Sequence, residues 1–205
     1  LITSDGVPQL TSSEVRAALK YHQKFLQFMP GESEYSTVNT LFLEGMADST
    51  IGGPWLVPSA REAGIDLGFA TMPVVDETGL PLAPYTGVQG VHVLKVAAEQ
   101  KHDTIARVLS VLTDPQVGID LANASGCAPA NILAYEDASV TGDPMVTTMR
   151  QIAETAQPMP NIPQMDVMWT VMGNLLVAVN MSGGVVETET TKYQAKAEQL
   201  IEAMQ

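Results

Sequence analysis

The sequence has one cysteine, few positive charges and few aromatic residues, and each shortage excludes something. Cys127 has no second thiol with which to form an intramolecular disulfide or a cysteine-based metal site. Ten lysines and arginines face 23 aspartates and glutamates, a net charge of −13, so a nucleic-acid partner is not expected. No apolar run approaches the roughly 18 residues that would span a bilayer. With 45% hydrophobic residues over 205 positions, the chain can bury a core.

Turn and cap patterns divide the chain into helices separated by short extended segments. Thr11 and Glu14 have the spacing of a capping box, which predicts a first helix that runs to Pro30-Gly31. Asp114 and Asp143 each precede a proline, which predicts the start of a helix at both places. Helices are expected at 36–44, 98–112, 115–124, 144–156, 164–181 and 187–204, and strands at 48–53, 67–72 and 85–96.

The expected strands are too few for the number of helices. Three strands do not make a self-sufficient central sheet, which commonly has about five or six. The alternation of strands and helices is nevertheless typical of the α/β class. The pattern therefore predicts an α/β chain that is part of a larger fold.

Motifs for catalysis, metals and cofactors are absent from the sequence. His22, His92 and His102 lack the spacing of zinc ligands. The segment Ser182-Gly183-Gly184 lacks the lysine and the flanking pattern of a phosphate-binding loop, and no serine lies in a nucleophile elbow. We therefore predict no catalytic residue, no metal, no cofactor and no enzymatic activity.

Two tryptophans stand out because only 5% of the residues are aromatic. Trp55 follows Gly52-Gly53-Pro54, where a backbone without side chains lets another group approach closely. Trp169 follows the proline-rich segment 158–163, near the start of a predicted helix. Burial in the core is the ordinary role of tryptophan and remains open for both residues. The alternative is that both indoles offer flat apolar faces to a ring-shaped ligand such as a sugar.

Methionines are concentrated around the same proline-rich segment. Met165, Met172 and Leu176 share a helical face with Trp169, a pattern typical of a core stripe. Met159 precedes the helix and is therefore the methionine that we expect to line a cleft.

The chain contains a series of different short motifs. They are Phe42-x-Glu44-Gly45, Ile51-Gly52-Gly53-Pro54-Trp55, Leu67-Gly68-Phe69 to Met72-Pro73, Leu112-Thr113-Asp114, and Met159-Pro160-Asn161-Ile162-Pro163-Gln164-Met165 with Trp169. Together they resemble, in the same order, the maltose/maltodextrin-binding proteins. These are bacterial extracellular solute-binding proteins of carbohydrate ABC transporters. The resemblance extends over nearly all 205 residues, and the run that begins at Met159 is its most specific part.

The resemblance implies a fold of the type II periplasmic-binding-protein class, in which two α/β lobes joined at a hinge enclose the ligand. It covers the C-terminal half of that fold. Residues 1–84 are expected in the C-terminal lobe, residues 85–135 in the N-terminal lobe with the hinge crossings, and residues 136–205 again in the C-terminal lobe.

The resemblance also implies a site and a function. Family members stack sugar on aromatic residues at the positions of Trp55 and Trp169, and the position of Met159 lies beside the ligand. The chain is therefore expected to bind maltose or maltodextrin between the lobes and to deliver it to an ABC transporter permease. Such a protein is periplasmic or extracellular, with a membrane-anchored lipoprotein as one form.

Two other functions remain open. A carbohydrate-active enzyme, or its sugar-binding module, would need two carboxylates facing one cleft, and no such pair stands beside either tryptophan. An assembly fragment could pair with a second copy as a swapped homodimer, because missing strands leave edges that favour exchange. Because a closed site needs contacts from both lobes, we expect the 205-residue chain alone to bind maltodextrin weakly or not at all.

Overall fold

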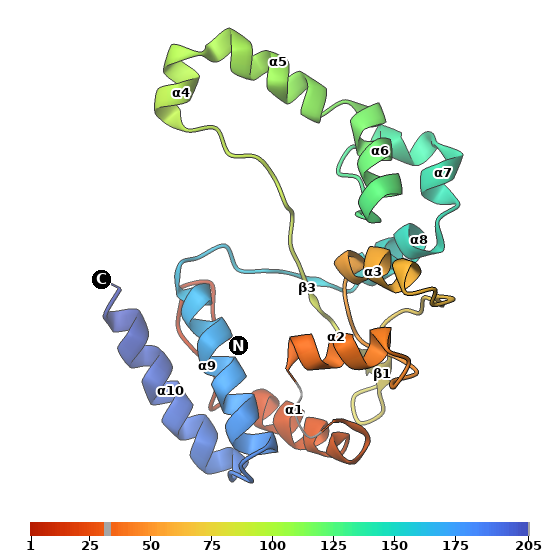
Figure 1. Ribbon diagram of the computed structural model, residues 1–205. Helices are drawn as coiled ribbons and strands as arrows, with labels where there is room; N and C mark the ends of the chain where they lie inside the picture. The colour runs from red at the N-terminus through yellow and green to blue at the C-terminus, as the bar shows by residue number, and fades with distance from the viewer. Residues whose placement is uncertain (31–33, 205) are drawn as a thin grey trace. The chain divides into compact units, whose positions relative to one another are not determined.

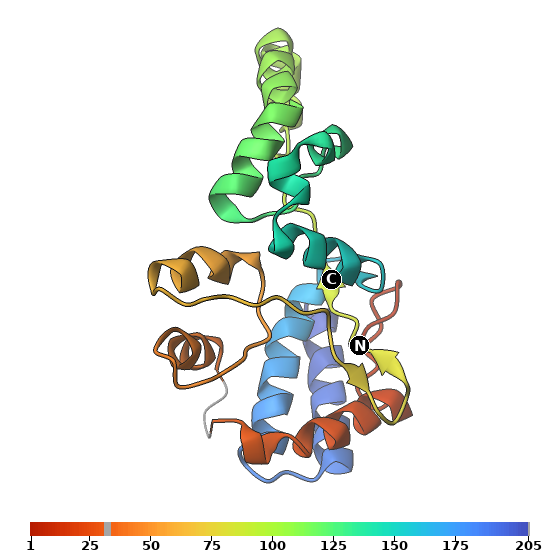
Figure 2. The ribbon, with the colours of Figure 1, turned by 90° about the vertical axis from the view of Figure 1, so that its right-hand side faces the viewer.

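A computed structural model describes residues 1–30 and 34–204 (Figures 1 and 2). Its contacts divide into two units. Unit 1 comprises Leu1–Val38 with Pro160–Gln205, and unit 2 comprises Asn39–Met159. The helices and strands are α1 Ser13–Gln23, η1 Leu26–Phe28, α2 Tyr35–Leu43, η2 Pro54–Leu56, α3 Val57–Glu62, β1 Val74–Val75, β2 Leu80–Pro81, β3 Tyr85–Thr86, α4 Lys95–Gln100, α5 His102–Leu112, α6 Pro115–Ser125, η3 Ile132–Glu136, α7 Ala138–Thr141, α8 Pro144–Ala153, β4 Gln157–Pro158, α9 Gln164–Asn180 and α10 Val186–Glu202, where η denotes a 3-10 helix.

Unit 1 is built on three helices. Figures 1 and 2 both show α9 and α10 side by side, with α1 across one end of the pair. The fully buried side chains Leu175 of α9 and Ala197 of α10 contribute to the core, and Leu19 of α1 is 3% exposed. Buried Thr190 accepts a hydrogen bond from Nε of Arg16 at 3.0 Å, which ties α10 to α1. This helical core holds the N-terminal half of α9 in place.

Unit 2 has its own apolar cluster. Val57, at the start of α3, packs with Ala122 of α6, Val140 of α7, and Met145 and Val146 of α8. All five side chains are at most 6% exposed. The turn that carries Trp55 directly precedes Val57 and is therefore attached to this cluster.

The two predicted aspartate caps are confirmed. Asp114 accepts a hydrogen bond from the backbone N–H of Gln116 at 2.8 Å and starts α6. Asp143 accepts one from Met145 at 2.7 Å and starts α8. An aspartate satisfies a helical N–H that has no carbonyl partner, and the proline after it has no N–H to satisfy.

Several helix ends differ from the sequence prediction. The first helix is capped by Ser12 rather than Thr11, since the Ser12 hydroxyl accepts from Val15 N at 3.3 Å. It ends at Gln23, and the chain then tightens into η1. The predicted stop at Gly31 lies outside the described residues.

The predicted helix 98–112 is instead two helices. The first, α4, already starts at Lys95, inside the predicted strand 85–96. The second, α5, starts at His102, because Lys101 has a φ of −134° and a ψ of 31° that interrupt the helical hydrogen bonds. The helix predicted at 144–156 also ends early, at Ala153.

The predicted strands are mostly wrong within the described residues. Residues 48–53 and 67–72 form no sheet ladder there, and the strand predicted at 85–96 is reduced to β3. A strand forms only where another backbone takes up its N–H and C=O groups. The described pairs are β1 with β2, antiparallel, and β3 with β4, parallel. None of the described helices is long and apolar enough to cross a membrane.

Candidate functional site

The turn at Pro54–Leu56 fixes the position of Trp55. Pro54 occupies the first turn of η2, where its missing N–H has no intrahelical partner to lose. Immediately after the tryptophan, Leu56 is 9% exposed and Val57 is 6% exposed. Trp55 itself is 64% exposed. The turn therefore holds an exposed indole next to two buried side chains, those of Leu56 and Val57.

The Trp55 indole lies against the backbone of Gly53. A β-carbon built on Gly53 would stand 2.3 Å from both Cη2 and Cζ3 of the ring, far inside a normal contact. The sequence predicts that some group approaches the backbone closely at these glycines, and the structure identifies that group as the neighbouring indole.

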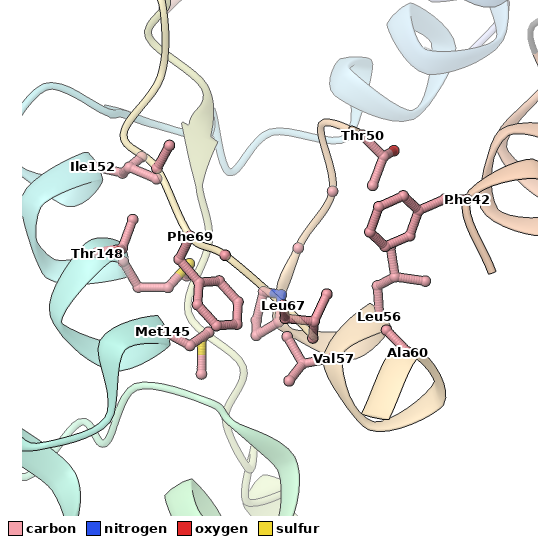
Figure 3. A pocket seen from close by; sticks show the side chains of 16 residues that line it. Phe42, Thr50, Leu56, Val57, Ala60, Leu67, Phe69, Met145, Thr148 and Ile152 are labelled. Atoms are coloured by element: carbon pink, nitrogen blue, oxygen red, sulfur yellow. The ribbon is translucent and has the colours of Figure 1, made fainter. Parts of the chain in front are cut away.

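A cavity of about 160 Å³ lies in unit 2 beside the same turn (Figure 3). Figure 3 shows Phe42, from the end of α2, on one side and Thr148 and Ile152, from α8, on the other. The cavity is lined by Phe42, Thr50, Gly52, Gly53, Pro54, Leu56, Val57, Ala60, Leu67, Gly68, Phe69, Ala70, Met145, Thr148, Met149 and Ile152. This lining is mostly apolar and contains no carboxylate among the described residues.

Thr50 supplies a polar atom to the cavity wall. Its Oγ1 is shielded from solvent and has no hydrogen-bond partner among the described residues. A buried hydroxyl without a partner costs free energy, commonly about 1–3 kcal/mol. No sequence pattern marks Thr50, because a single threonine in an extended segment forms no motif.

Met159 lies where two segments of unit 2 run parallel. In the register of β3 and β4, Tyr85 pairs with Gln157 and Thr86 with Pro158. The backbone N–H of Met159 donates to the carbonyl of Thr86 at 3.0 Å. Its side chain is 41% exposed. The ladder therefore fixes the backbone of Met159 and leaves much of the thioether at the surface.

Trp169 lies on the second turn of α9 and is 57% exposed. The predicted core stripe is wrong for this residue and for Leu176, which is 36% exposed. The buried stripe is rotated around the helix and consists of Met165, Met168, Val171, Leu175 and Val179. Because α9 packs through that stripe, Trp169 is held on the margin of the packed face. Trp55 and Met159 belong to unit 2, whereas Trp169 belongs to unit 1.

The carboxyl groups with resolved pKa shifts lie at helix starts rather than in the cavity wall. The pKa of Asp137 is lowered by hydrogen bonds from the hydroxyl and N–H of Ser139. The pKa of Glu14 is lowered by a backbone N–H and by neighbouring serines. The pKa of Glu187 is lowered chiefly by the ammonium group of Lys20. These shifts belong to helix caps and an interhelical ion pair.

In the part of the chain that the structure describes, no group of three or more histidine, cysteine, aspartate or glutamate side chains gathers as metal ligands would. Unit 2 thus carries the exposed indole of Trp55, the exposed thioether of Met159 and an apolar cavity, and unit 1 carries the exposed indole of Trp169. Each indole can hold an apolar ring face.

Comparison with known proteins decides the family. Residues 2–148 match the model of the bacterial extracellular solute-binding proteins. The chain belongs to this family.

The curated relatives of this solute-binding protein are named for oligosaccharides, among them maltotriose, maltodextrin and galactooligosaccharide. A maltotriose-binding protein of Pyrococcus abyssi is 28% identical over 79% of this chain and 36% of its own length. A maltodextrin-binding protein of Bacillus subtilis is 26% identical over 94% of this chain and 46% of its own length. The chain thus spans less than half the length of these two relatives.

Solved structures confirm the fold class. The maltose/maltodextrin-binding domain from Bdellovibrio bacteriovorus, bound to maltotriose, superimposes with a TM-score of 0.82 at 27% identity, over 98% of this chain and 54% of that one. A maltose-maltodextrin-binding protein of Alicyclobacillus acidocaldarius, at 22% identity, gives a TM-score of 0.83 over 92% of this chain and 51% of that one. The predicted type II periplasmic-binding-protein fold is therefore confirmed, and the chain corresponds to about half of each neighbour.

The sequence located the elements that carry the candidate residues but missed what supports them. Val57 and Gly53 hold Trp55 in place, the first from the core and the second from under the ring. The Gly-Gly-Pro-Trp run was the available indication for Gly53, whereas no short pattern marks Val57 as a contact of α6, α7 and α8. The binding roles of Trp55, Trp169 and Met159 stay predictions.

Proposed function

We propose that the chain forms part of a receptor that captures maltodextrin and delivers it to an ABC transporter permease, with Trp55, Trp169 and Met159 contacting the sugar. The observation that carries this proposal is the exposed indole of Trp55 next to the buried Leu56 and Val57, in a chain two of whose relatives are named for maltotriose and maltodextrin. The axial C–H face of a glucose ring is apolar, so it packs on an indole while its hydroxyl groups seek polar partners.

In this proposal residues 1–84 and 136–205 belong to one lobe, and residues 85–135 belong to the other. The sugar would bridge the lobes, and the permease would recognise the closed form. Such a shift requires that the ligand bind the closed state more tightly than the open one. The parallel pairing of β3 with β4 supports a crossing at this place, because it ties together two segments 72 positions apart in register.

We propose that the protein binds its sugar without converting it. Hydrolysis of a glycosidic bond needs two carboxyl groups facing the bond, and the described lining of the cavity in unit 2 contains neither aspartate nor glutamate.

We further propose an extracellular location with a lipid anchor, since a relative in Streptococcus pneumoniae is named a solute-binding lipoprotein. Association with a second copy finds no support in the comparisons and stays a prediction.

The test is a titration of the chain with maltotriose, with raffinose as the control trisaccharide. Binding is measured by calorimetry and by the indole N–H signals in NMR spectra. Maltotriose should shift the signals of Trp55 and Trp169, and raffinose should not. Trp55→Ala or Trp169→Ala should each weaken binding by about tenfold, equivalent to ~1.4 kcal/mol. Phe28→Ala, at an aromatic residue that is 80% exposed, is the control and should leave binding unchanged.

Two results would overturn the proposal. Binding of maltotriose, detected by calorimetry or by shifts of other signals, without a change in either indole signal would refute sugar contact at these positions. Release of maltose or glucose from maltotriose, detected by chromatography, would favour the enzyme instead.

A further inference from the structure

The backbone conformation of Gly53 does not require a glycine. Its φ of −119° and ψ of 177° are extended values that any residue adopts. The four residues from Gly53 to Leu56 form a turn closed by the hydrogen bond from Leu56 N to the Gly53 carbonyl at 3.1 Å. An alanine could make the same bond. Some other feature must account for the missing side chain.

That feature is the Trp55 ring. A β-carbon on Gly53 would meet Cη2 and Cζ3 at 2.3 Å and Cζ2 at 2.6 Å, whereas carbon atoms in contact stand about 3.5–4.0 Å apart. The three nearest atoms all belong to the indole, and no backbone atom is among them. An added methyl group would therefore displace the ring by rotation of the Trp55 side chain rather than unfold the turn.

The residues on either side of Trp55 would not be displaced by a methyl group on Gly53. Val57 is anchored among the buried side chains of α6, α7 and α8. Pro54 has its φ restricted by its ring. The indole is consequently the part that can move, and its 64% exposure leaves room for that movement.

We propose that Gly53 is a positioning residue that sets the plane of the Trp55 indole for stacking against a glucose ring of the ligand. This inference rests on the proposed function. The contact between the indole and the backbone of Gly53 limits the orientations of the ring before the sugar arrives. Preorganisation of this kind raises affinity because less side-chain freedom is lost on binding.

Gly52 provides a matched control at the adjacent position. A β-carbon there would lie 3.3 Å from Cδ2 of Leu56, a contact that a shift of a few tenths of an ångström relieves. Gly52→Ala and Gly53→Ala both restrict the backbone of the unfolded chain, the second more strongly because Gly53 precedes Pro54. The spectroscopic signals of the folded Trp55 indole do not depend on that restriction, so a difference between the two variants in these signals reports on the indole.

The first experiment observes the ring in the absence of sugar. In a Trp169→Phe background Trp55 is the remaining tryptophan, so its emission and its near-ultraviolet circular dichroism report its orientation. Gly53→Ala should change both signals, and Gly52→Ala should leave them as in the background protein. Unchanged Trp55 signals in Gly53→Ala would overturn the inference. A Gly53→Ala protein that loses its far-ultraviolet circular dichroism would also overturn it, because the glycine would then be required for folding.

The second experiment measures maltotriose binding by NMR titration with Trp169 intact. Gly53→Ala should weaken binding by about tenfold, the size expected for the loss of one stacking contact. In a Trp55→Leu background the same substitution should have no effect, because the ring that it displaces is absent. An equal loss in both backgrounds would mean that Gly53 acts through the backbone and would overturn the inference. If maltotriose bound without any change at the Trp55 indole, the proposed sugar site would fail, while the sugar-free measurement would still decide whether Gly53 orients the indole.

Discussion

At the scale of the residue, adjacent positions on one helix have different roles. Leu175 is completely buried, whereas Leu176 is 36% exposed and lies toward the same side of α9 as Trp169. Both leucines fit an apolar helix of 17 residues, and neither differs from the other in helix propensity. Packing against α1 and α10 separates them.

This difference predicts a difference in stability. Leu175→Ala should lower the free energy of unfolding by about 2–5 kcal/mol, because it removes apolar contacts and leaves a cavity. Leu176→Ala, the control, should lower it by about 1 kcal/mol or less, since surface substitutions rarely cost more. Urea unfolding followed by far-ultraviolet circular dichroism measures both values. Equal losses in the two variants would show that α9 packs through another face.

At the scale of the element, local chemistry sets the starts of the helices. Asp143 accepts from Met145 N at 2.7 Å, and its other oxygen lies 3.7 Å from Nη2 of Arg61. An asparagine retains the cap oxygen but removes the charge. The two roles are therefore separable by substitution.

Asp143→Ala should destabilise unit 2 by about 1 kcal/mol, within the usual range for loss of an N-cap. Asp143→Asn should cost little, because asparagine caps a helix about as well as aspartate and the partly exposed ion pair, with its atoms 3.7 Å apart, contributes weakly. The measurement is thermal or urea unfolding of the three proteins. If Asp143→Asn lowered the free energy of unfolding as much as Asp143→Ala, the contribution of Asp143 to stability would come from its ion pair with Arg61 instead.

The ion pair between Lys20 and Glu187 joins α1 to α10 and predicts a pH dependence. The Lys20 ammonium group lowers the pKa of Glu187 below its ordinary value of 4.5. The folded state therefore favours the ionised carboxylate, and this contribution to stability is complete above the unfolded pKa. It is lost as the pH falls through the lower, folded pKa.

The comparison of the unmodified chain with Glu187→Gln tests this dependence. The difference between their free energies of unfolding should be present at neutral pH and should vanish as the solution is acidified well below pH 4.5. It should also shrink with added salt, because both side chains are about half exposed. Glu189→Gln, which removes a pair within α10, is the control for a carboxylate that does not link helices. A difference that grew on acidification would contradict the assignment.

At the scale of the whole molecule, the chain spans about half the length of the solved structures that it matches. A sugar that bridges two lobes gains affinity from both, and ligand binding stabilises the folded state in proportion to the logarithm of the ligand excess over Kd. We therefore expect the 205-residue chain to bind maltotriose more weakly than micromolar, with a correspondingly small rise in Tm at millimolar sugar. Submicromolar binding in calorimetry would show that this chain alone carries a sufficient site.

The net charge of −13 has its effect at the same scale. It predicts no affinity for nucleic acid, because phosphate contacts require a basic surface. Titration with a labelled DNA duplex at low salt, where such contacts are strongest, should show no binding. A salt-sensitive complex would contradict this expectation.

The sequence by itself determined the family and the positions of most helices. Aspartate–proline pairs placed the starts of α6 and α8, and the ordered run of motifs around Trp55 and Met159 predicted the solute-binding fold. Tertiary structure decided which face of α9 is buried, where the predicted strands lack partners, and that the indole of Trp55 rests on Gly53. The physical reason is range. A cap or a turn depends on hydrogen bonds within a few residues, whereas a buried face, a strand or a ring contact depends on the groups that packing brings beside it.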